Sequence, residues 1–392
     1  MIELFNDTEI AFARYSTAEL KKAQWMFRCF AYPSLVKMGN YFFTIAFAIR
    51  LPIKTLLRKT VFSHFCGGET LEEAMPVVKK LKMAGVQSIL DFSVEASNSE
   101  ASIVRNLLET QHSIKVAAKH DEIPFAVFKP TGFGDPDLLE KASNNSLLSD
   151  NDQSLISLYE NRIEQLCYEA FKAGIPILID AEEVRYQAFI DDLVEKMMMK
   201  YNHDKCIVFN TLQMYRTDRL DFLKASIAKA KEHKYLLGLK FVRGAYMERE
   251  RERAIKLGLD SPIYPTKEAT DKAFDEAISI AFHELDCVTL FCGSHNETSN
   301  ALLASLIREK GIAPGDKRIF FSQLFGMSDH ISFNLAKLGF NVVKYIPYGP
   351  IKEVMPYLSR RAEENTSVKG QSGRELQRIE RELIRRKRTQ LK

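Results

Sequence analysis

The stretch YLLGLKFVRGAYMERER, residues 235–251, contains the pattern that decides the fold of this chain. An almost unbroken apolar run covers residues 236–243 and is followed by Gly244 and a highly charged segment. Such a run is typical of a strand that is buried on both faces of a parallel sheet. The stretch therefore predicts a strand that leads through a tight turn into a helix.

Seven other runs of the same kind lie beyond residue 65. They predict strands at residues 86–94, 124–129, 176–180, 206–210, 287–292, 318–322 and 341–346. Amphipathic segments predict helices at residues 69–83, 100–119, 155–173, 183–200 and 218–233, and a final helix at 350–365. Residues 131–154 are polar and predict a long loop. About eight β-then-α units in a row favour an α/β fold of the (β/α)8 TIM-like barrel type over an open sheet.

The composition excludes several classes of protein. Of 392 residues, 46% are hydrophobic and 27% are charged, as in ordinary globular domains, so disordered and collagen-like chains are excluded. Lys+Arg 55 minus Asp+Glu 51 gives +4, and residues 374–392 alone carry eight basic and three acidic residues, or +5. The remainder therefore carries −1, and we expect no nucleic acid as a partner.

The cysteines and the start of the chain favour a reducing compartment. None of the six cysteines forms a C-x-x-C pair, and the first residues, MIELFND, are acidic where a signal peptide would be basic. We expect free, mostly buried thiols. The His and Cys spacing matches no zinc template, so no metal site is expected.

The most apolar segment, residues 41–49, is far shorter than the roughly 20 residues of a membrane-spanning helix. Lys54, Arg58 and Lys59 follow it, which is typical of a segment that lies in a membrane interface. The alternative is a helix that packs against the main domain, and the sequence favours this alternative.

Polar residues gather where the predicted strands end. These residues are Asp91, Ser93, Lys129, Asp180, Asn210, Lys240, Arg243, Ser294, His295, Gln323 and Tyr345. In a (β/α)8 barrel the carboxyl ends of the strands form the rim that carries the active site. Each of these residues alone could merely close its strand, but their agreement over eight strands predicts a site at this rim.

The chain contains neither G-x-G-x-x-G nor a P-loop, so a nucleotide cofactor would need other means of binding. Three segments offer such means. In residues 239–250, Gly244 and Ala245 allow a flat ring to approach the backbone between cations. Residues 264–271 open a helix with a hydroxyl and a lysine, which suits a pyrophosphate, and residues 293–296 lead from a strand into a helix. Each segment alone also fits an ordinary turn.

The final predicted helix carries a candidate anion site. Tyr357, Arg360, Arg361 and Glu364 are spaced i, i+3, i+4 and i+7 and so share one face. Adjacent guanidinium groups can bind a carboxylate, and the tyrosine adds a flat apolar wall. The alternative is a solvated face with ion pairs along the helix.

Taken with these segments, the motifs YLLGLKFVRGAYMERER, PIYPTKEATDKAF, CGSHN, FFSQLFGMSDHISF, VVKYIPYGPIKEVMPYLSRRAEENTS and ILIDAEE resemble the proline dehydrogenase (proline oxidase) family. The resemblance runs from about residue 65 to the last barrel helix and is greatest to stand-alone, mitochondrial-type members. It implies FAD at the rim of the barrel and oxidation of L-proline to Δ1-pyrroline-5-carboxylate by hydride transfer to flavin N5. It also implies that the electrons pass to a membrane quinone.

The resemblance assigns roles by matching motif positions. Lys129, Arg360 and Arg361 would bind the proline carboxylate, while Tyr345, Tyr357 and Leu324 would enclose the ring. Asp180, Tyr246 and Glu364 belong to the same set, and Glu69 resembles the glutamate that pairs with the arginine aligned with Arg360 to gate the site. The flavin would be held by Asn210, Lys240, Val242, Gly244, Ala245, Thr266, Lys267, His295, Asn296 and Gln323.

Three positions modify this interpretation. Lys240 and Asn210 stand where bacterial bifunctional relatives carry arginine and glutamine, which affects the flavin potential more than flavin binding. Tyr345 favours unsubstituted proline, because hydroxyproline-preferring relatives tend to carry a smaller residue there.

The enzymatic alternative is a Schiff-base aldolase that uses Lys129 or Lys240.

The chain is expected to contain an N-terminal helical arm at 1–64, the barrel at 65–366 and a basic helical tail at 367–392. The tail places Leu376, Ile379 and Leu383 on one side, so it could contact acidic lipid, a partner helix or nucleic acid. Because a quinone dissolves in membrane, peripheral contact with a membrane surface is the favoured interpretation. Without an arginine-rich presequence, the expected location is the bacterial cytoplasm, at the inner membrane. The sequence leaves the oligomeric state open.

Overall fold

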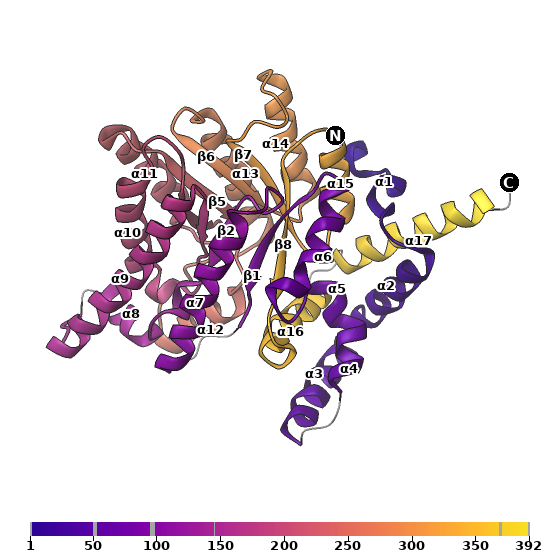
Figure 1. Ribbon diagram of the computed structural model, residues 1–392, viewed down its shortest axis with the longest axis horizontal. Coiled ribbons are helices and arrows are strands. Elements are labelled where there is room, and N and C mark those ends of the chain that lie inside the picture. Colours follow the sequence, from indigo (N-terminus) through magenta and orange to yellow (C-terminus); the bar gives the residue numbers. More distant parts are fainter. Residues whose placement is uncertain (1, 50–52, 95–98, 145, 368–370, 391–392) are drawn as a thin grey trace. The chain divides into compact units, whose positions relative to one another are not determined.

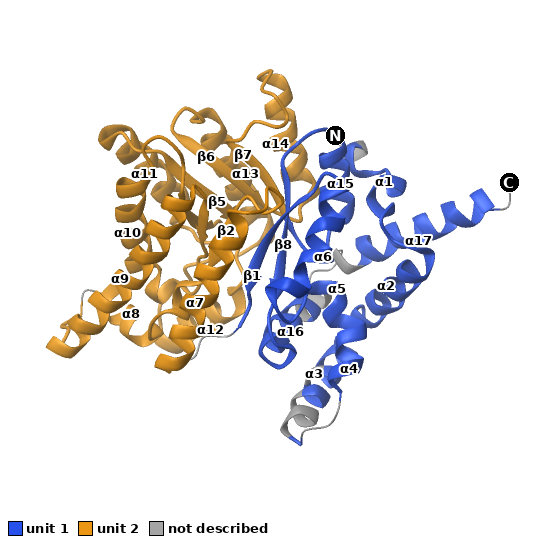
Figure 2. Ribbon diagram, in the orientation of Figure 1, with its two compact units in different colours: residues 1–95, 323–392 blue, residues 96–322 orange. Residues whose placement is uncertain are grey.

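The computed structural model describes residues 2–49, 53–94, 99–144, 146–367 and 371–390. The chain forms two compact units, which Figure 2 shows in different colours. Unit 1 comprises Met1–Glu95 and Gln323–Lys392, and unit 2 comprises Ala96–Ser322. The sequence predicts a different division of the chain, with boundaries at 64 and 366, and that division stays a prediction.

Unit 2 alternates strands and helices. Its strands are β2 (Ala126–Phe128), β3 (Ile177–Ile179), β4 (Val208–Gln213), β5 (Leu237–Val242), β6 (Val288–Gly293) and most of β7 (Ile319–Leu324). Its helices are α7 (Glu100–Ala117), η3 (Pro130–Gly132), α8 (Pro136–Ser143), α9 (Asp150–Ala173), α10 (Val184–Tyr201), α11 (Arg219–His233), α12 (Met247–Leu257), α13 (Lys267–His283) and α14 (Glu297–Glu309).

Unit 1 combines both ends of the chain. Its elements are η1 (Ile2–Phe5), α1 (Thr8–Phe12), α2 (Thr17–Phe30), α3 (Pro33–Ala48), α4 (Lys54–Leu57), η2 (Arg58–Phe62), α5 (Ser63–Phe65), α6 (Leu71–Lys82), β1 (Gln87–Phe92), α15 (Asp329–Lys337), β8 (Val342–Tyr348), α16 (Ile351–Ser367) and α17 (Gln371–Gln390). Figure 1 shows these elements along the chain.

The eight strands belong to one sheet in the order β1-β8-β7-β6-β5-β4-β3-β2. The described pairs are parallel; in β4 and β5, for example, Thr211 is the register partner of Lys240 and Gln213 that of Val242. With helices between successive strands, this is the TIM-like (β/α)8 fold, and the predicted fold class is confirmed. In unit 2, Phe125 fills the strand layer with its ring edge-on to Phe209, Phe291 and Phe320.

Several predicted bounds are wrong. Strand β4 ends at Gln213 rather than 210, because Thr211 and Gln213 are polar residues inside a fully buried strand and hide its end from a hydrophobicity pattern. The predicted loop 131–154 contains α8 and the start of α9. Asp135 caps α8 with Pro136 in its first turn, and Ser149 forms a capping box for α9.

The basic tail is part of the core of unit 1. Helix α17 packs against α1 and α2, so that Ile379 is only 2% exposed and joins the same hydrophobic cluster as Phe27. The Arg386 guanidinium donates to the Phe12 carbonyl (2.9 Å), and the buried Glu382 accepts from Thr8 (3.0 Å). The apolar side of the tail is therefore already occupied by the arm.

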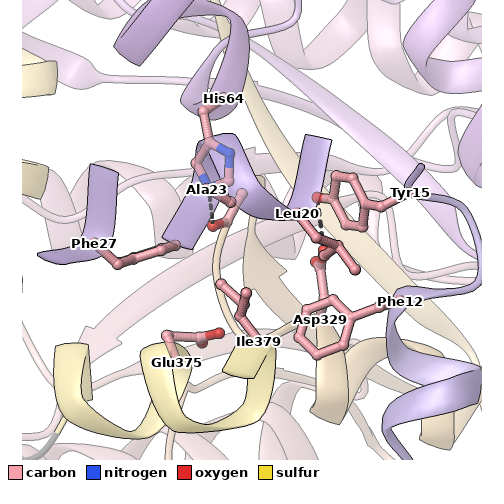
Figure 3. Close-up of a pocket in the computed structure, with 10 residues that line it drawn as sticks. Phe12, Tyr15, Leu20, Ala23, Phe27, His64, Asp329, Glu375 and Ile379 are labelled. Atoms are coloured by element: carbon pink, nitrogen blue, oxygen red, sulfur yellow. Dashed lines mark hydrogen bonds between the residues drawn. The ribbon is translucent and has the colours of Figure 1, made fainter. Parts of the chain in front are cut away.

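A buried ion network joins the arm to β8. The Asp329 carboxylate lies 2.7 Å from the Arg14 guanidinium and 2.8 Å from the Lys344 ammonium, and it accepts a 2.8 Å hydrogen bond from Tyr15. Burial alone would raise the pKa of Asp329, but the charges of Arg14 and Lys344 hold it well below its usual value. Figure 3 shows Tyr15 and Asp329 together beside a small cavity that His64 and Glu375 also line.

The loop between β7 and α15 is held by groups from several segments. Lys344 donates to the Met327 carbonyl (2.5 Å), His64 to the Gly326 carbonyl (2.9 Å), and the Ser328 amide donates to Glu375 (2.6 Å). Gly326 has φ +78°, and a Cβ there would lie 2.3 Å from the His64 carbonyl oxygen. Only glycine fits this position.

Within the described part of the chain, no helix is both long and apolar enough to cross a membrane. Each of the six cysteines is a free thiol, and Cys66, Cys167, Cys206 and Cys292 are buried, as the sequence predicts.

Acidification is expected to destabilise the fold through His64. Burial lowers the pKa of His64 from 6.5 to about 4, and the charges of Arg14 and Lys22 act in the same direction. Between these two values the unfolded chain binds more protons than the folded chain, so the free energy of unfolding falls as the pH falls. The contribution reaches about 1.4 kcal/mol per pH unit.

Urea unfolding at a series of pH values measures this effect in the wild type, in His64→Gln and in His203→Gln, which changes an exposed histidine. The slope between about pH 6.5 and pH 4 should shrink only in His64→Gln. An unchanged slope in that variant would contradict the assignment.

Candidate functional site

The predicted site residues fall into two groups, one in each unit. In unit 2, Lys240 of β5 forms a 2.6 Å ion pair with Asp180, which directly follows β3. Both side chains are largely buried. The pair joins a cation of β5 to an anion that follows β3, across the strand β4 that lies between them in the sheet.

Arg243 joins three elements just beyond β5. Its guanidinium donates to Asp271 of α13 (2.6 Å), to Ser294 after β6 (2.7 Å) and to Ser299 of α14 (2.9 Å). It also lies 4.4 Å from the centre of the Phe274 ring. These contacts fix the first turns of α13 and α14 to the end of β5.

The starts of α13 and α14 are well-formed helix N-termini. Thr266 caps α13 by accepting from the Ala269 amide (3.2 Å), and Asn296 caps α14 by accepting from the Thr298 amide (2.8 Å). Lys267 lies in the first turn of α13 and pairs with Asp271. Helix N-termini with adjacent cations are suited to phosphate groups, so the residues present fit a cofactor that carries a pyrophosphate.

Gly244 gives the turn after β5 its shape. It has φ +135°, and a Cβ there would lie 2.5 Å from the Tyr215 ring, so the position requires glycine. The next amide, that of Ala245, donates to the Gln213 side chain (3.3 Å), which itself donates to the Glu182 carbonyl (2.6 Å). The ring that lies against Gly244 in this structure is that of Tyr215, and the approach of a flat cofactor ring to this backbone stays a prediction.

Gln213 was missed by the sequence analysis, and Asn210 was chosen on that strand instead. Asn210 lies in the middle of β4 and donates to Asp191 of α10 (2.9 Å), which also pairs with Arg219 of α11. Because side chains alternate along a strand, Asn210 and Gln213 are on opposite faces. The structure therefore groups Gln213, and not Asn210, with Ala245 at the carboxyl end. The feature of the sequence that could have indicated Gln213 is the segment QMYR, which begins directly after residue 212.

The other predicted residues of unit 2 also follow strands. Lys129 comes directly after β2, Val242 is the last residue of β5, Tyr246 precedes α12 and His295 lies between β6 and α14. Glu182, which the sequence offers only as part of the motif ILIDAEE, is a buried carboxylate. It accepts hydrogen bonds from the amide and the hydroxyl of Thr131. Burial raises its pKa.

The group in unit 1 centres on α16. The Arg361 guanidinium lies 5.2 Å from the centre of the Tyr357 ring, and Arg361 is only 8% exposed. Tyr345 of β8 is buried, and its carbonyl accepts from the amide of Phe325, the residue after Leu324 (2.9 Å). Gln323 is buried too, with its side-chain oxygen accepting from Ser332 (2.7 Å).

Glu69 has other partners than the resemblance implies, and the role of Glu364 stays a prediction. The ion pairs of Glu69 join it to Lys54 (2.9 Å) and Arg58 (3.7 Å), so the expected pair with Arg360 is not among them. The physical reason is that the lysine and arginine of α4 and η2 lie within reach of the same carboxylate. The side chain of Glu364 lies outside the described residues, although its backbone is part of α16.

Comparison with known proteins gives the following relatives. The family model described as proline dehydrogenase matches residues 74–374. "Proline dehydrogenase 1, mitochondrial" of Dictyostelium discoideum is 33% identical over an alignment of 382 residues that covers 86% of this chain and 66% of the relative. The Homo sapiens protein of the same name is 32% identical over 94% of this chain and 57% of its own length.

Two further relatives come from bacteria. "Carbapenem antibiotics biosynthesis protein CarD" of Pectobacterium carotovorum is 34% identical over 83% of this chain and 84% of its own length. The crystal structure of proline utilization A from Bdellovibrio bacteriovorus has a TM-score of 0.72 at 19% identity, and it covers 94% of this chain and 41% of that chain. At this identity the likeness supports the fold alone.

The comparisons also correct one expectation. The bacterial cytoplasmic location at the inner membrane is wrong, because relatives from Dictyostelium discoideum, Homo sapiens and Arabidopsis thaliana are named mitochondrial. The sequence argument rested on a missing presequence, yet the chain spans only 57% and 66% of two of these relatives. Since the family model covers most of the chain and the relatives exceed 30% identity, this chain belongs to the proline dehydrogenase family.

Proposed function

We propose that this chain oxidises L-proline to Δ1-pyrroline-5-carboxylate with FAD as its cofactor and that a quinone takes up the electrons. Family membership supports the reaction. The observation that carries the proposal is Arg361, a guanidinium that is nearly buried and stacked against Tyr357, with Arg360 as its neighbour in the chain. Buried, aromatic-backed guanidinium groups bind carboxylates through paired, charge-assisted hydrogen bonds.

The substrate roles follow from the chemistry of each side chain. Arg360, Arg361 and Lys129 would bind the carboxylate, while Tyr345, Tyr357 and Leu324 would enclose the apolar ring. Proline must react with a neutral amine, because the nitrogen lone pair assists loss of hydride from the adjacent carbon. The residues that bind the carboxylate therefore supply orientation, which alone can account for much of the rate.

The cofactor roles follow from unit 2. When bound, FAD supplies the two-electron acceptor that the side chains lack. Thr266, Lys267, His295 and Asn296 would hold its phosphates. Gly244 and Ala245 would leave space at the backbone, and Lys240 and Gln213 would donate to the ring system, Gln213 in the place that the sequence analysis gave to Asn210.

The deciding experiment is anaerobic addition of substrate to the purified protein. The protein should be yellow, and L-proline, but not hydroxyproline, should bleach the flavin absorbance. A colourless protein that refuses added FAD would refute the proposal. A lysine adduct that borohydride traps from a carbonyl substrate would instead support the aldolase alternative.

Replacement of Arg361 by methionine is expected to raise the KM for proline by about 10²-fold or more, because a desolvated charge-assisted pair contributes about 3 kcal/mol. Steady-state kinetics with a soluble quinone measures this effect. Arg381→Met, which changes an exposed arginine of α17, serves as the control. Unchanged kinetics in Arg361→Met would refute the carboxylate assignment.

Replacement of Gly244 by alanine is expected to lower both the flavin content and the stability. The positive φ costs an alanine about 1–2 kcal/mol, and the clash with Tyr215 adds about 1–3 kcal/mol. Gly258→Ala is the matched control, since Gly258 also has positive φ (+66°) but no atom lies within 4 Å of the place that its Cβ would take. Flavin absorbance per chain and urea unfolding measure the two effects. Equal losses in both variants would show that the close approach at Gly244 is unimportant.

A further inference from the structure

Unit 2 contains a buried carboxylate that the proposed reaction does not use. It belongs to Glu182, which lies two residues after Asp180 in the segment between β3 and α10 and is only 7% exposed. The amide and the hydroxyl of Thr131 both donate to it, at 2.9 and 2.8 Å. Burying a carboxylate costs free energy unless hydrogen bonds compensate, so this pairing is a specific feature of the fold and not a consequence of apolar packing.

Thr131 belongs to the turn η3, which begins directly after Lys129. Lys129 caps this turn, and its carbonyl accepts from the Gly132 amide (3.0 Å). The carboxylate of Glu182 is therefore bound two residues away from the lysine that we assign to the proline carboxylate. A movement of the turn would move the main chain that carries this lysine.

The polar groups of the turn are held from several segments of unit 2. Asn106 of α7 donates to the Gly132 carbonyl (3.0 Å), and Arg162 of α9 donates to the Phe133 carbonyl (3.1 Å). These two helices hold the far end of the turn. Glu182 holds the end that is nearer to the lysine.

The backbone of Glu182 is itself fixed, so its carboxylate can serve as an anchor. Its amide donates to the Gln187 side chain (3.3 Å), and its carbonyl accepts from the Gln213 side chain (2.6 Å). Gln187 in turn donates to Asp191 on the same helix, α10 (2.9 Å). A binding side chain requires support of this kind, because its position must be set before the substrate arrives.

The charge of Lys129 also reaches this carboxylate. Burial raises the pKa of Glu182, whereas the hydrogen bonds from Thr131 and the positive charge of Lys129 act in the opposite direction. Glu182 could therefore act on the lysine by holding its turn or by its negative charge. A glutamine separates the two, because its amide oxygen can accept from the Thr131 amide and its NH2 group can donate to the hydroxyl oxygen, while the charge is lost.

We propose that Glu182 is a positioning residue for substrate binding: its two hydrogen bonds to Thr131 fix the turn that carries Lys129, and thereby the ammonium group that binds the proline carboxylate. The inference rests on the proposed function, since the role of Lys129 is part of it. A misplacement of about 1 Å in a group that orients a substrate can have a large effect, so a small movement of the turn suffices.

The first test compares Glu182→Ala with Glu182→Gln in the flavin-loaded protein. Glu182→Ala should raise the KM for proline about tenfold and leave kcat and the flavin content close to the wild type, because uniform binding of the substrate is weakened. Glu182→Gln should keep KM within about threefold of the wild type, because both hydrogen bonds can form. A wild-type KM in Glu182→Ala would overturn the proposal. So would equal losses in both variants, because the charge would then be the cause.

A matched pair of threonines provides a milder change and its control. Thr131 and Thr8 are both buried, and each donates its hydroxyl to a buried glutamate, Thr131 to Glu182 (2.8 Å) and Thr8 to Glu382 of unit 1 (3.0 Å). Valine keeps the shape of threonine, so each variant should fold and lose one buried hydrogen bond. Only Thr131→Val should raise KM, by about three- to fivefold. The same KM in both valine variants would contradict the proposal.

The second test asks whether the effect passes through Lys129. Lys129→Met should raise KM by itself, and Glu182→Ala should then add less than about twofold, since residues that act as one unit are not additive. Fully additive losses would show that Glu182 acts elsewhere and would overturn the inference.

A binding measurement that does not depend on turnover completes the test. Cyclopentanecarboxylate carries the ring and the carboxylate of proline but no amine that could be oxidised, and calorimetric titration of the flavin-loaded variants gives its Kd. The Kd values should follow the same order as the KM values. Variants that all bind this probe like the wild type would refute the inference alone, whereas wild-type protein that fails to oxidise proline would refute the proposed function and the inference with it.

Discussion

The carboxylate of Asp329 is the group on which the organisation of unit 1 depends. It binds Arg14 and Tyr15 from the arm and Lys344 from β8; the charged side chains of Arg14 and Lys344 are 8% and 0% exposed, and Tyr15 is partly buried. Removing one partner from such a buried pair typically costs about 3–5 kcal/mol, because the remaining charge is left without compensation. That amount is a large part of the stability of an ordinary domain. The arm is therefore an integral part of the fold, although the family model begins only at residue 74.

This network also bears on the site, because its members flank the residues that we assign to the substrate. Lys344 precedes Tyr345 on β8, and its ammonium donates to the Met327 carbonyl in the loop that follows Leu324. His64 and Glu375 hold the same loop from α5 and α17. The backbone positions of Leu324 and Tyr345 thus depend on contacts with residues from both ends of the chain. Preorganisation of this kind is what a binding site requires of its supporting residues.

The sequence was sufficient for the barrel, because buried parallel strands are long apolar runs and eight such runs are visible. The sequence was insufficient where buried strand residues are polar. Because Thr211 and Gln213 are polar, β4 was predicted to end at residue 210, and Asn210 was chosen as the site residue of that strand. It also could not identify partners that are distant in sequence. The stripe of Leu376, Ile379 and Leu383 is equally compatible with lipid and with a helix, and only the structure shows that α2 covers it. The pairs of Glu69 with Lys54 and Arg58 were invisible for the same reason.

The charge distribution separates two basic segments that look alike in the sequence. Residues 20–68 carry +8 and residues 374–392 carry +5, so with a total of +4 the remaining residues carry 4 − 8 − 5 = −9. In the tail, Glu382 binds both Arg385 and Arg386, and Glu9 binds Arg385, so the charges of these two arginines are balanced within unit 1. Residues 20–68 contain neither aspartate nor glutamate. The two segments therefore differ in how their charge is balanced: residues 374–392 include acidic partners of their own, whereas cations of residues 20–68 pair with carboxylates of other segments, as in Arg28 with Glu380 and Lys54 with Glu69.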